Sequence, residues 1–390
     1  MSASLASIWS IAWAPLWLFF LHPLWRRSAS PHYPWVIGGH RGRAYSDNSA
    51  AVELEARSMD QATVWIANRA IAQALAKEGI PVLTRGTWSA RRAISQASAL
   101  IYSHGEDDLD LFLLLLRGRT AFRIYLNHSL NLLKAGGVTD PQLKKASPLI
   151  RFIKLRLLTA FDALLCASEK ERTNFKRSYP MQTEKMHLGG GAHLDEWAKG
   201  LGRTPKKQIY WFPTFRDTPA GSAELEKNIE RVCASTALQK WLLQNGYRLL
   251  IGSHINIGKN SDSSLLSLPF VAAPLAHLVR DIRESELLIS DYSGVVFDYL
   301  LLKRPQILFA FDLENYLKTR ALYVKFSSLD FALHPRTADE LVDALVLEKF
   351  RDPTLESAAT RWREKTLPPY DSNFSKQSYA SIRRLLAAAS

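Results

Sequence analysis

A polar turn between an apolar run and a helical stretch, at residues 289–298, constrains this chain most. The run Leu287–Ile289 is typical of a buried strand, and Val295–Lys303 has helical spacing with no breaker. The segment Asp291–Gly294 is therefore predicted to form a strand-to-helix turn. The first amides of a helix lack partners within it and carry a positive dipole end, and a serine and a glycine let a phosphate approach them. The turn is a candidate site for a nucleotide diphosphate; a serine N-cap with ordinary packing is the alternative.

Length and charge narrow the class of protein. A chain of 390 residues with 47% hydrophobic content predicts two domains with large cores. Its two cysteines, Cys166 and Cys233, cannot form a disulfide framework and lack metal-ligand spacing, so the chain is expected to face the cytosol. The net charge of +13 and a pI of about 9.7 indicate a polyanionic partner: nucleic acid, an acidic membrane surface or a phosphorylated substrate.

The N-terminal segment is nearly all apolar from Ile8 to Trp25 and contains four tryptophans, which suits a membrane interface. It lacks a basic start and a cleavage site, so a secretory signal is not expected. The stretch is slightly short for a full span and is interrupted by Pro15 and Pro23. We interpret residues 1–28 as a membrane-embedded or interfacial anchor, with the body in the cytoplasm. A hydrophobic arm packed on the adjacent domain is the alternative.

Strand-like and helical runs alternate along the chain. Strand-like runs are expected at Trp35–Ile37, Pro81–Leu83, Ala99–Tyr102, Phe122–Leu126, Ala163–Cys166, Ile209–Phe212, Tyr247–Ile251, Leu287–Ile289 and Gln306–Phe309. Helical stretches lie between them, such as Ala50–Ser58 and Val64–Glu78. This alternation predicts an α/β fold with parallel sheets covered by helices on both faces.

A segment rich in glycine, proline and lysine at Lys199–Lys207 is typical of an interdomain linker. We therefore expect two Rossmann-like domains with an interdomain cleft, the GT-B architecture, with ligands at the carboxyl ends of the strands. The predicted boundaries are 29–200 for an acceptor-side domain and 201–365 for a donor-binding domain. Residues 366–390 would form a C-terminal helix that packs back on the first domain.

A basic amphipathic segment spans Leu143–Leu158, with Lys144, Lys145, Arg151 and Lys154 among its charges. Such a segment can lie on anionic lipid. A surface helix with a solvated basic face is the alternative.

Several motifs carry a family resemblance. The segment Ile209–Asp217 is similar to "APTWRD", and Tyr45–Ser49 is similar to "YSDNS". Residues Ile289–Tyr299, Lys303–Pro305 and Phe311–Tyr316 resemble the signature "SDYSSVxFDY…KRP…DLEEY" in order and spacing. The chain thus resembles the CDP-glycerol:poly(glycerophosphate) glycerophosphotransferases, which are the teichoic acid primases and polymerases.

The resemblance implies a GT-B fold and a peripheral or monotopic enzyme on the cytoplasmic face of a bacterial cell membrane. It implies transfer of glycerol phosphate or a related alditol phosphate from a CDP-activated donor to a hydroxyl of a lipid-linked or polymeric glycan, with release of CMP. The product would be a teichoic-acid-like cell-wall or capsule polymer. The CDP-alditol is then a substrate, and neither a cofactor nor nucleic acid is expected. The oligomeric state stays open.

Two alternatives remain. A GT-B glycosyltransferase could use a nucleotide sugar with a lipid acceptor. A non-catalytic membrane scaffold or nucleic-acid-binding protein would also fit the basic charge, but that charge is dispersed rather than gathered in a stripe interleaved with aromatic residues.

The expected base on the acceptor side is His128. The family element "WHGTPLK" aligns with Leu126–Lys134, where the histidine is kept and the Trp, Gly and Pro are replaced. A neutral histidine near pH 7 is well matched to taking a proton from an attacking hydroxyl. A histidine that caps a strand end is the alternative.

The expected donor contacts lie in the second half. Arg216 can clamp phosphate oxygens bidentately, and Thr214 can add a hydroxyl. Ser293 and the amides of Gly294 and Val295 would bind the diphosphate, where charge develops on transfer.

Further donor-side residues follow from the resemblance. His254 aligns with the histidine of an "RxHP" element and would donate to a donor phosphate, and Arg320 aligns with an arginine downstream of "DLEEY". A surface ion pair is the alternative for either arginine. Among the acidic residues of this half, Asp217, Asp291 and Asp298, the last two are expected to orient hydroxyls or arginines, or to act as caps. Asp298 could instead be a helix-surface charge.

The glycine-rich segment Gly189–Asp195 aligns with a family "GxPRxD" turn, with Ala192 and His193 in place of the Pro and Arg. Its glycines allow close approach of a ligand, and a hinge or a simple turn is the alternative. No cluster of His, Asp and Glu has metal-ligand spacing, and an arginine with helix amides suffices to hold phosphates, so no metal is expected.

Overall fold

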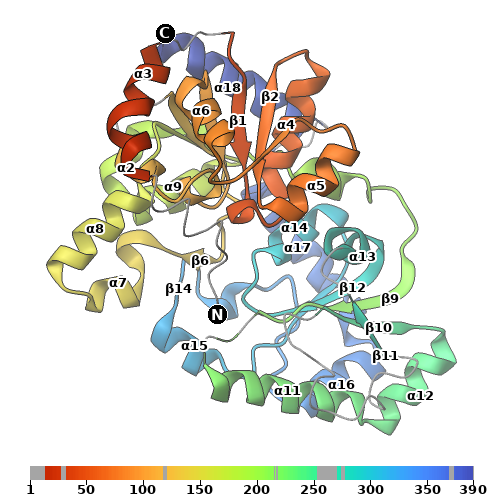
Figure 1. Cartoon of the computed structure of the whole chain (residues 1–390). Coiled ribbons are helices and arrows are strands. Elements are labelled where there is room, and N and C mark those ends of the chain that lie inside the picture. The colour runs from red at the N-terminus through yellow and green to blue at the C-terminus, as the bar shows by residue number, and fades with distance from the viewer. Residues whose placement is uncertain are drawn as a thin grey trace.

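Two parallel β-sheets, one in each half of the chain, form the framework of the computed structural model (Figure 1). The structure describes residues 14–27, 32–116, 121–214, 216, 218–252, 270–273, 277–368 and 373–389. The seven-stranded sheet has the order β3 (Val82–Thr84), β2 (Thr63–Ala67), β1 (Trp35–Gly38), β4 (Ala99–Tyr102), β5 (Phe122–Tyr125), β7 (Ala163–Cys166), β8 (Met186–Leu188). The five-stranded sheet has the order β11 (Phe270–Ala273), β10 (Arg248–Gly252), β9 (Lys206–Trp211), β12 (Ser285–Ser290), β13 (Gln306–Leu308).

Strand order reverses at the centre of each sheet, between β1 and β4 and between β9 and β12. Such a reversal leaves a crevice outside the carboxyl ends of the two central strands, where doubly wound proteins bind ligands. The α/β class and the two Rossmann-like sheets predicted from the sequence are confirmed.

Helices cover the sheets. Those of the first half are α4 (Asp47–Ser58), α5 (Arg69–Lys77), α6 (Trp88–Gln96), α7 (Pro141–Lys145), α8 (Pro148–Leu158), α9 (Glu169–Ser178) and α10 (Leu194–Ala198). Those of the second half are α11 (Pro219–Cys233), α12 (Thr236–Asn245), α13 (Leu278–Glu284), α14 (Val295–Tyr299), α15 (Leu313–Thr319), α16 (Ala338–Val346), α17 (Pro353–Thr366) and α18 (Phe374–Ala389). The central strands are buried on both faces, so their sequences are continuous apolar runs.

One predicted helix is wrong in its first part. The stretch expected to be helical from Val64 forms strand β2 up to Ala67, and helix α5 begins only at Arg69. Val64, Trp65 and Ile66 are β-branched or aromatic, which favours a strand. Pairing with β1 and β3 on either side then fixes them in the sheet.

The two halves of the chain share an apolar interface. The short strands β6 (Lys134–Ala135) and β14 (Ala321–Leu322) pair antiparallel between the halves. One buried cluster joins Leu130 and Trp197 of the first half to Tyr292 and Val295 of the second. Helix α18 runs back to the first half and packs on α4, beside the upper sheet in Figure 1. An extensive hydrophobic interface of this kind opposes free motion between domains.

The N-terminal segment packs on the first domain through α2 (Ala14–Leu16), the π-helical turn η1 (Trp17–Leu21) and α3 (His22–Arg27). The indole of Trp17 is buried and donates to Ser95 Oγ at 3.0 Å on α6. Phe19 and Phe20 on the same segment are each 69% exposed. Among the described residues, no helix is long and apolar enough to cross a membrane.

Candidate active site

Three histidines follow three neighbouring strands of the larger sheet. His40 follows β1, His104 follows β4 and His128 follows β5, and β1, β4 and β5 are adjacent in the sheet. Because parallel strands end at the same edge, the fold gathers these side chains at the crevice of the first domain. The His104 ring stacks on His128 with 4.5 Å between centroids and lies 3.9 Å from the ring of His40.

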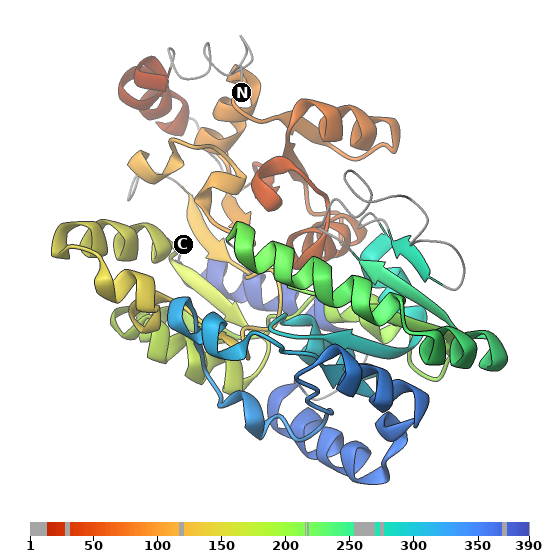
Figure 2. The ribbon, with the colours of Figure 1, turned by 90° about the horizontal axis from the view of Figure 1, so that it is seen from below.

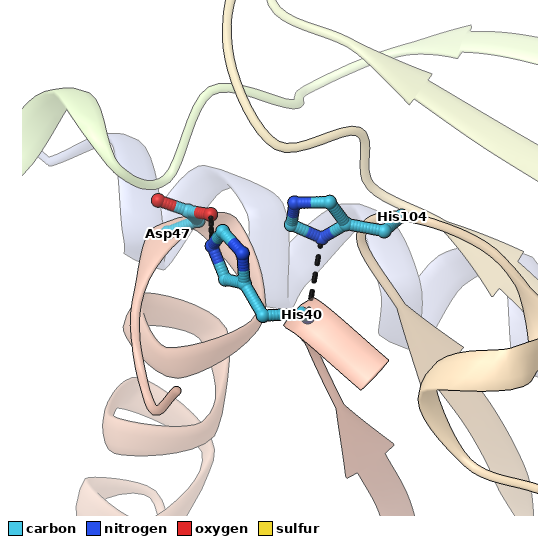
Figure 3. Close-up of side chains that lie close together, drawn as sticks. All are labelled: His40, Asp47 and His104. Carbon is cyan, nitrogen blue, oxygen red and sulfur yellow. Dashed lines mark hydrogen bonds and ion pairs between the residues drawn. The ribbon is translucent and has the colours of Figure 1, made fainter. Parts of the chain in front are cut away.

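The hydrogen bonds of His104 fix which ring nitrogen carries its proton. The backbone N–H of His40 donates to His104 Nδ1 at 3.3 Å (Figure 3), and the Ser103 hydroxyl lies 3.0 Å from the same nitrogen. A backbone N–H can only donate, so Nδ1 presents its lone pair and Nε2 carries the proton. The carboxylate of Asp108 accepts the backbone N–H of His104 at 2.8 Å and holds the turn.

Burial and neighbouring rings keep two of the histidines neutral. Burial, with help from His128 and His40, lowers the pKa of His104 to about 3. The side chain of His128 is exposed to solvent, yet the protein around it lowers its pKa, chiefly by desolvation. A neutral His128 has a free lone pair at neutral pH, which a general base needs.

His40 and Asp47 form an ion pair beside these rings. Figure 3 shows the His40 ring facing the Asp47 carboxylate, with 2.5 Å between Nε2 and Oδ2. Burial works against charge on both groups, but the hydrogen bond and mutual attraction raise the pKa of His40 and lower that of Asp47. When this pair holds a proton, the proton therefore resides on His40 rather than on Asp47.

The backbone around the histidines is strained. His40, Arg41, Asp47 and Asn127 have φ angles of 49°, 55°, 61° and 60°, in the left-handed region that L residues avoid. They are four of the seven non-glycine residues with positive φ in the described part of the chain. Strain of this kind persists where the surroundings enforce it, and it gathers at functional sites.

His40, Asp47 and His104 are also the one group in the described ranges whose ligand atoms could converge on a metal ion, all within 4.8 Å of one another. The hydrogen-bond geometry of this group fits protons better than a metal ion. Two ligands about 2.1 Å from one cation stand roughly 3 Å apart or more, whereas His40 and Asp47 are 2.5 Å apart. Binding through His104 Nε2 would also move the ring proton to Nδ1, where it would oppose the backbone N–H of His40 and break that hydrogen bond.

The second candidate region lies at the crevice of the smaller sheet, where Thr214 and Arg216 follow β9 and Asp291–Gly294 follows β12. The predicted strand-to-helix turn is confirmed, and α14 begins directly after Gly294. Asp291 is 2% exposed and accepts backbone N–H bonds from Thr214 at 2.9 Å and Tyr292 at 2.6 Å. Its carboxylate holds the turn together.

Arg216 is buried and bound to two carboxylates. It donates to both oxygens of Asp312, at 2.6 and 2.9 Å, and its Nη1 lies 2.9 Å from Asp291. The guanidinium also packs 5.1 Å above the ring of Tyr292, whose hydroxyl donates to Asp312. Burial opposes the charge, but these carboxylates raise the pKa of Arg216 further. Arg216 therefore shapes the turn; its direct contact with phosphate stays a prediction.

The other predicted donor residues occupy varied positions. Ser293 is partly buried, and its hydroxyl accepts the Val295 N–H at 3.4 Å. The Thr214 hydroxyl is buried with no hydrogen-bond partner among the described residues. Arg320 ends α15. Asp298 is buried rather than on a helix surface and lies 3.1 Å from His193. Asp217 and His254 lie outside the described residues.

Gly294 brings the two regions into contact. A β-carbon at this position would lie 3.2 Å from Ser129 Oγ and 3.3 Å from the Leu130 carbonyl. The turn Asp291–Gly294, named the donor turn here for its predicted role, therefore lies against the residues that directly follow His128. The pairing of Tyr323 N–H with the Leu133 carbonyl at 2.9 Å continues this contact between the halves.

One known family matches almost the whole chain. The family model described as CDP-Glycerol:Poly(glycerophosphate) glycerophosphotransferase matches residues 36–383. The chain belongs to this family. The resemblance drawn from the sequence motifs is confirmed.

The curated proteins that this chain resembles are named as teichoic acid primases and polymerases. Teichoic acid ribitol-phosphate polymerase TarK of Staphylococcus aureus is 29% identical over 185 residues, covering 46% of this chain and 33% of that protein. Teichoic acid glycerol-phosphate primase of Bacillus subtilis is 25% identical over 213 residues, covering 53% of each chain. The matches thus span between a third and about half of these relatives' lengths.

The family fold agrees with solved structures. The wall teichoic acid polymerase TagF superposes with a TM-score of 0.71 at 18% identity and covers 98% of each chain. An MnaA–UDP structure of S. aureus superposes less well, with a TM-score of 0.57 at 12% identity over 91% of this chain and 97% of that one. The GT-B-like fold class is confirmed.

Family membership alone does not identify His40, His104 or Asp312 as site residues. One signal for the two histidines was visible in the sequence. His40 and His104 each come within two residues of the end of an apolar strand, as His128 nearly does. Only the order of the strands shows that the three ends are neighbours.

Proposed function

We propose that this chain transfers glycerol phosphate or a related alditol phosphate from a CDP-activated donor to a hydroxyl of a lipid-linked or polymeric glycan, with release of CMP. The contact of Gly294 with Ser129 and Leu130 carries the proposal, because it joins the donor turn to the segment of the candidate base. Family membership supplies the class of donor.

The chemistry follows from these two regions. The acceptor oxygen attacks the β-phosphorus, and the bond from that phosphorus to the bridging oxygen breaks, so CMP leaves with the electron pair. The acceptor proton passes to His128, whose lowered pKa leaves it neutral and able to accept. Ser293 and the amides of Gly294 and Val295 bind the diphosphate as its charge grows.

Other donor contacts belong to the same proposal. Thr214 and Arg320 would contact the CDP moiety, and Asp217 and His254 would complete that side. Arg216 would act through Asp291 and Asp312, by holding the turn in the shape that receives the phosphates.

A membrane surface for a lipid-linked acceptor is part of the proposal. On α8, Leu149 and Phe152 are 68% and 56% exposed, and basic residues flank them. In both views of the molecule, α7 and α8 lie at the periphery, on the same side as the red N-terminal helices that expose Phe19 and Phe20 (Figures 1 and 2). Exposed apolar side chains among basic ones suit the surface of an anionic bilayer.

Vesicle sedimentation tests this surface. Phe152→Glu should weaken binding to phosphatidylglycerol vesicles, while Leu243→Glu should not, because Leu243 is an equally exposed apolar residue (65%) on α12 of the other domain. Equal binding by both variants would remove α8 from the membrane contact.

A panel of donors tests the function. Purified protein is given a lipid-linked glycan acceptor with CDP-glycerol, CDP-ribitol or UDP-sugars, and products are measured by mass spectrometry together with CMP release. We expect an alditol phosphate on the acceptor and CMP in equal amount. Turnover of a UDP-sugar alone would refute the proposal and establish the alternative glycosyltransferase.

A further inference from the structure

His193 is a buried histidine between the two halves of the chain, and the proposed chemistry does not use it. It follows the glycine-rich turn after β8 and is 8% exposed. Gly189 and Gly191 in this turn have φ angles of 107° and 87°, which L residues rarely adopt. The turn delivers the His193 ring between Asn48 of α4 and Asp298 of α14.

The orientation of the Asn48 amide is fixed by three hydrogen bonds. Its Nδ2 donates to the carbonyls of Leu126 at 3.1 Å and Asn127 at 3.0 Å. Its Oδ1 accepts the backbone N–H of His193 at 2.9 Å. A flipped amide would set oxygen against two carbonyls, so the assignment follows from the network.

This orientation decides the protonation of His193. Its Nδ1 lies 2.8 Å from Asn48 Oδ1, an acceptor, so Nδ1 carries a proton. Its Nε2 lies 3.1 Å from Asp298 Oδ1, and a carboxylate also only accepts, so Nε2 carries one too. The ring is an imidazolium, paired with Asp298 across the two halves.

The charges that face His193 come from three helices besides its own segment. Burial would lower its pKa, but Asp298 of α14, Asp47 of α4 and Glu171 of α9 outweigh burial and raise it. The field of His193 also reaches His128, whose pKa it helps to lower. A cation at His193 therefore favours a neutral base at His128.

Both partners of His193 lead to the candidate site. Asn48 holds the two carbonyls directly before His128. Asp298 lies on the helix that begins at the donor turn. The series from Asp298 through His193 and Asn48 thus links the donor turn to the backbone of the base.

We propose that protonated His193 is a positioning residue that holds the His128 segment in register with the donor turn, and that loss of its proton releases this link. The activity arm of the test rests on the proposed phosphotransfer. Transfer then requires a neutral His128 and a charged His193, so the rate should fall below the pKa of the first and above the pKa of the second.

Three variants separate this role from a structural one. His193→Arg keeps a cation at every pH, Asp298→Asn removes the carboxylate that holds the proton, and His187→Gln is a matched control on β8, outside the network. In rate profiles between pH 5 and 10, we expect wild type and His187→Gln to share an alkaline fall. His193→Arg should lack it, and Asp298→Asn should show it at lower pH.

His193→Gln keeps a polar side chain without the charge. We expect its kcat to fall on the order of 10²-fold with donor KM little changed, since a misplaced base costs about this much. An alkaline fall in His193→Arg identical to that of wild type would overturn the proposal.

A second measurement tests the protonation state of His193 directly. It uses wild-type protein and depends neither on activity nor on the folding of a variant. Nitrogen-15 NMR of histidine-labelled wild-type protein should show the His193 ring with both protons at pH 7 and titrating above 6.5. A neutral His193 at pH 7 refutes the inference. If the wild type turns over no CDP-alditol, the proposed function fails, and the NMR result still decides whether His193 is charged.

Discussion

The crevices of the two domains occupy equivalent places in similar sheets, yet their side chains are arranged differently. In the second domain, Arg216, Asp291 and Asp312 are buried and satisfy one another in a closed set of ion pairs. In the first, His104 and His128 are stacked and reachable by solvent, on a strained backbone. One crevice has a fixed, closed arrangement of ion pairs, whereas the other presents neutral histidines, which suit the proton transfer proposed above.

The difference indicates that the two crevices have separate roles in the proposed reaction. A diphosphate needs donors held in place before charge develops, which the closed ion pairs provide by fixing the turn. A base needs a free lone pair and access to the acceptor, which neutral, solvent-reachable histidines provide. Substitutions in the two crevices should therefore affect different properties.

The largest expected effect is on the rate. His128→Ala removes the base and should lower kcat by about 10²- to 10⁴-fold, with the melting temperature within a few degrees of wild type because the side chain is exposed. Single-turnover transfer from a CDP-alditol measures it. Unchanged turnover would remove His128 from the mechanism.

The next effect is on stability, in the other crevice. Arg216→Ala leaves two buried carboxylates without their cation, which costs about 3–5 kcal/mol in the free energy of unfolding. Urea unfolding measures it, with Arg231→Ala as a control because that arginine pairs with Asp339 on the exposed surface. A loss as small as that of the control would show that the closed set does not hold the turn.

Gly294→Val tests the contact between the crevices. Its side chain would press on Ser129 and Leu130, and such overpacking costs about 1–3 kcal/mol. We expect transfer to fall more than CDP affinity, because the displaced segment carries His128. Calorimetric CDP binding and transfer rates on one preparation measure both, and equal losses would place the fault in the donor turn alone.

Acid should destabilise the first crevice. The pKa of His104 in the folded state is about 3, below its ordinary value of 6.5, so the neutral ring contributes stability that is present above pH 6.5. As the pH falls below 6.5, the unfolded state takes up the proton first, at a cost that reaches about 2 kcal/mol at pH 5. Thermal unfolding of wild type and His104→Gln over this range should show a shallower loss in the variant; parallel curves would refute the assignment.

The smallest expected effect comes from a substitution that leaves the free energy of unfolding unchanged or increases it. Thr214→Val replaces a buried hydroxyl that lacks a partner among the described residues, so stability should be unchanged or rise by up to about 1 kcal/mol. If the hydroxyl contacts the donor in the complex, CDP affinity falls at the same time. Lost stability would show that the hydroxyl has a partner in the free protein.

The sequence predicted one crevice better than the other. The donor turn is a single continuous segment, so its apolar strand, its serine and glycine and its helix could all be located from local pattern. The histidine crevice is assembled from the turns after β1, β4 and β5, which only the order of strands brings together. Local pattern also mistook β2 for the start of a helix, since an apolar run does not show that strands flank it.

Side-chain partners were the least predictable part. The sequence predicted that Arg216 would clamp phosphate. In the structure its guanidinium binds Asp312, which lies 96 residues away in the sequence. Asp298 was expected as an orienting residue, a cap or a surface charge, and it pairs with His193 from the other domain. Such pairs depend on how the domains dock.

Binding of CDP tests most directly whether the two crevices have separate roles. Calorimetry with wild type, His128→Ala and Ser293→Ala separates the crevices, because CDP carries the diphosphate but no acceptor. We predict that His128→Ala binds CDP like wild type, and that Ser293→Ala binds about 10-fold more weakly or worse, the loss of one hydrogen bond to a charged group. Loss of CDP binding in His128→Ala, with Ser293→Ala unaffected, would contradict the account.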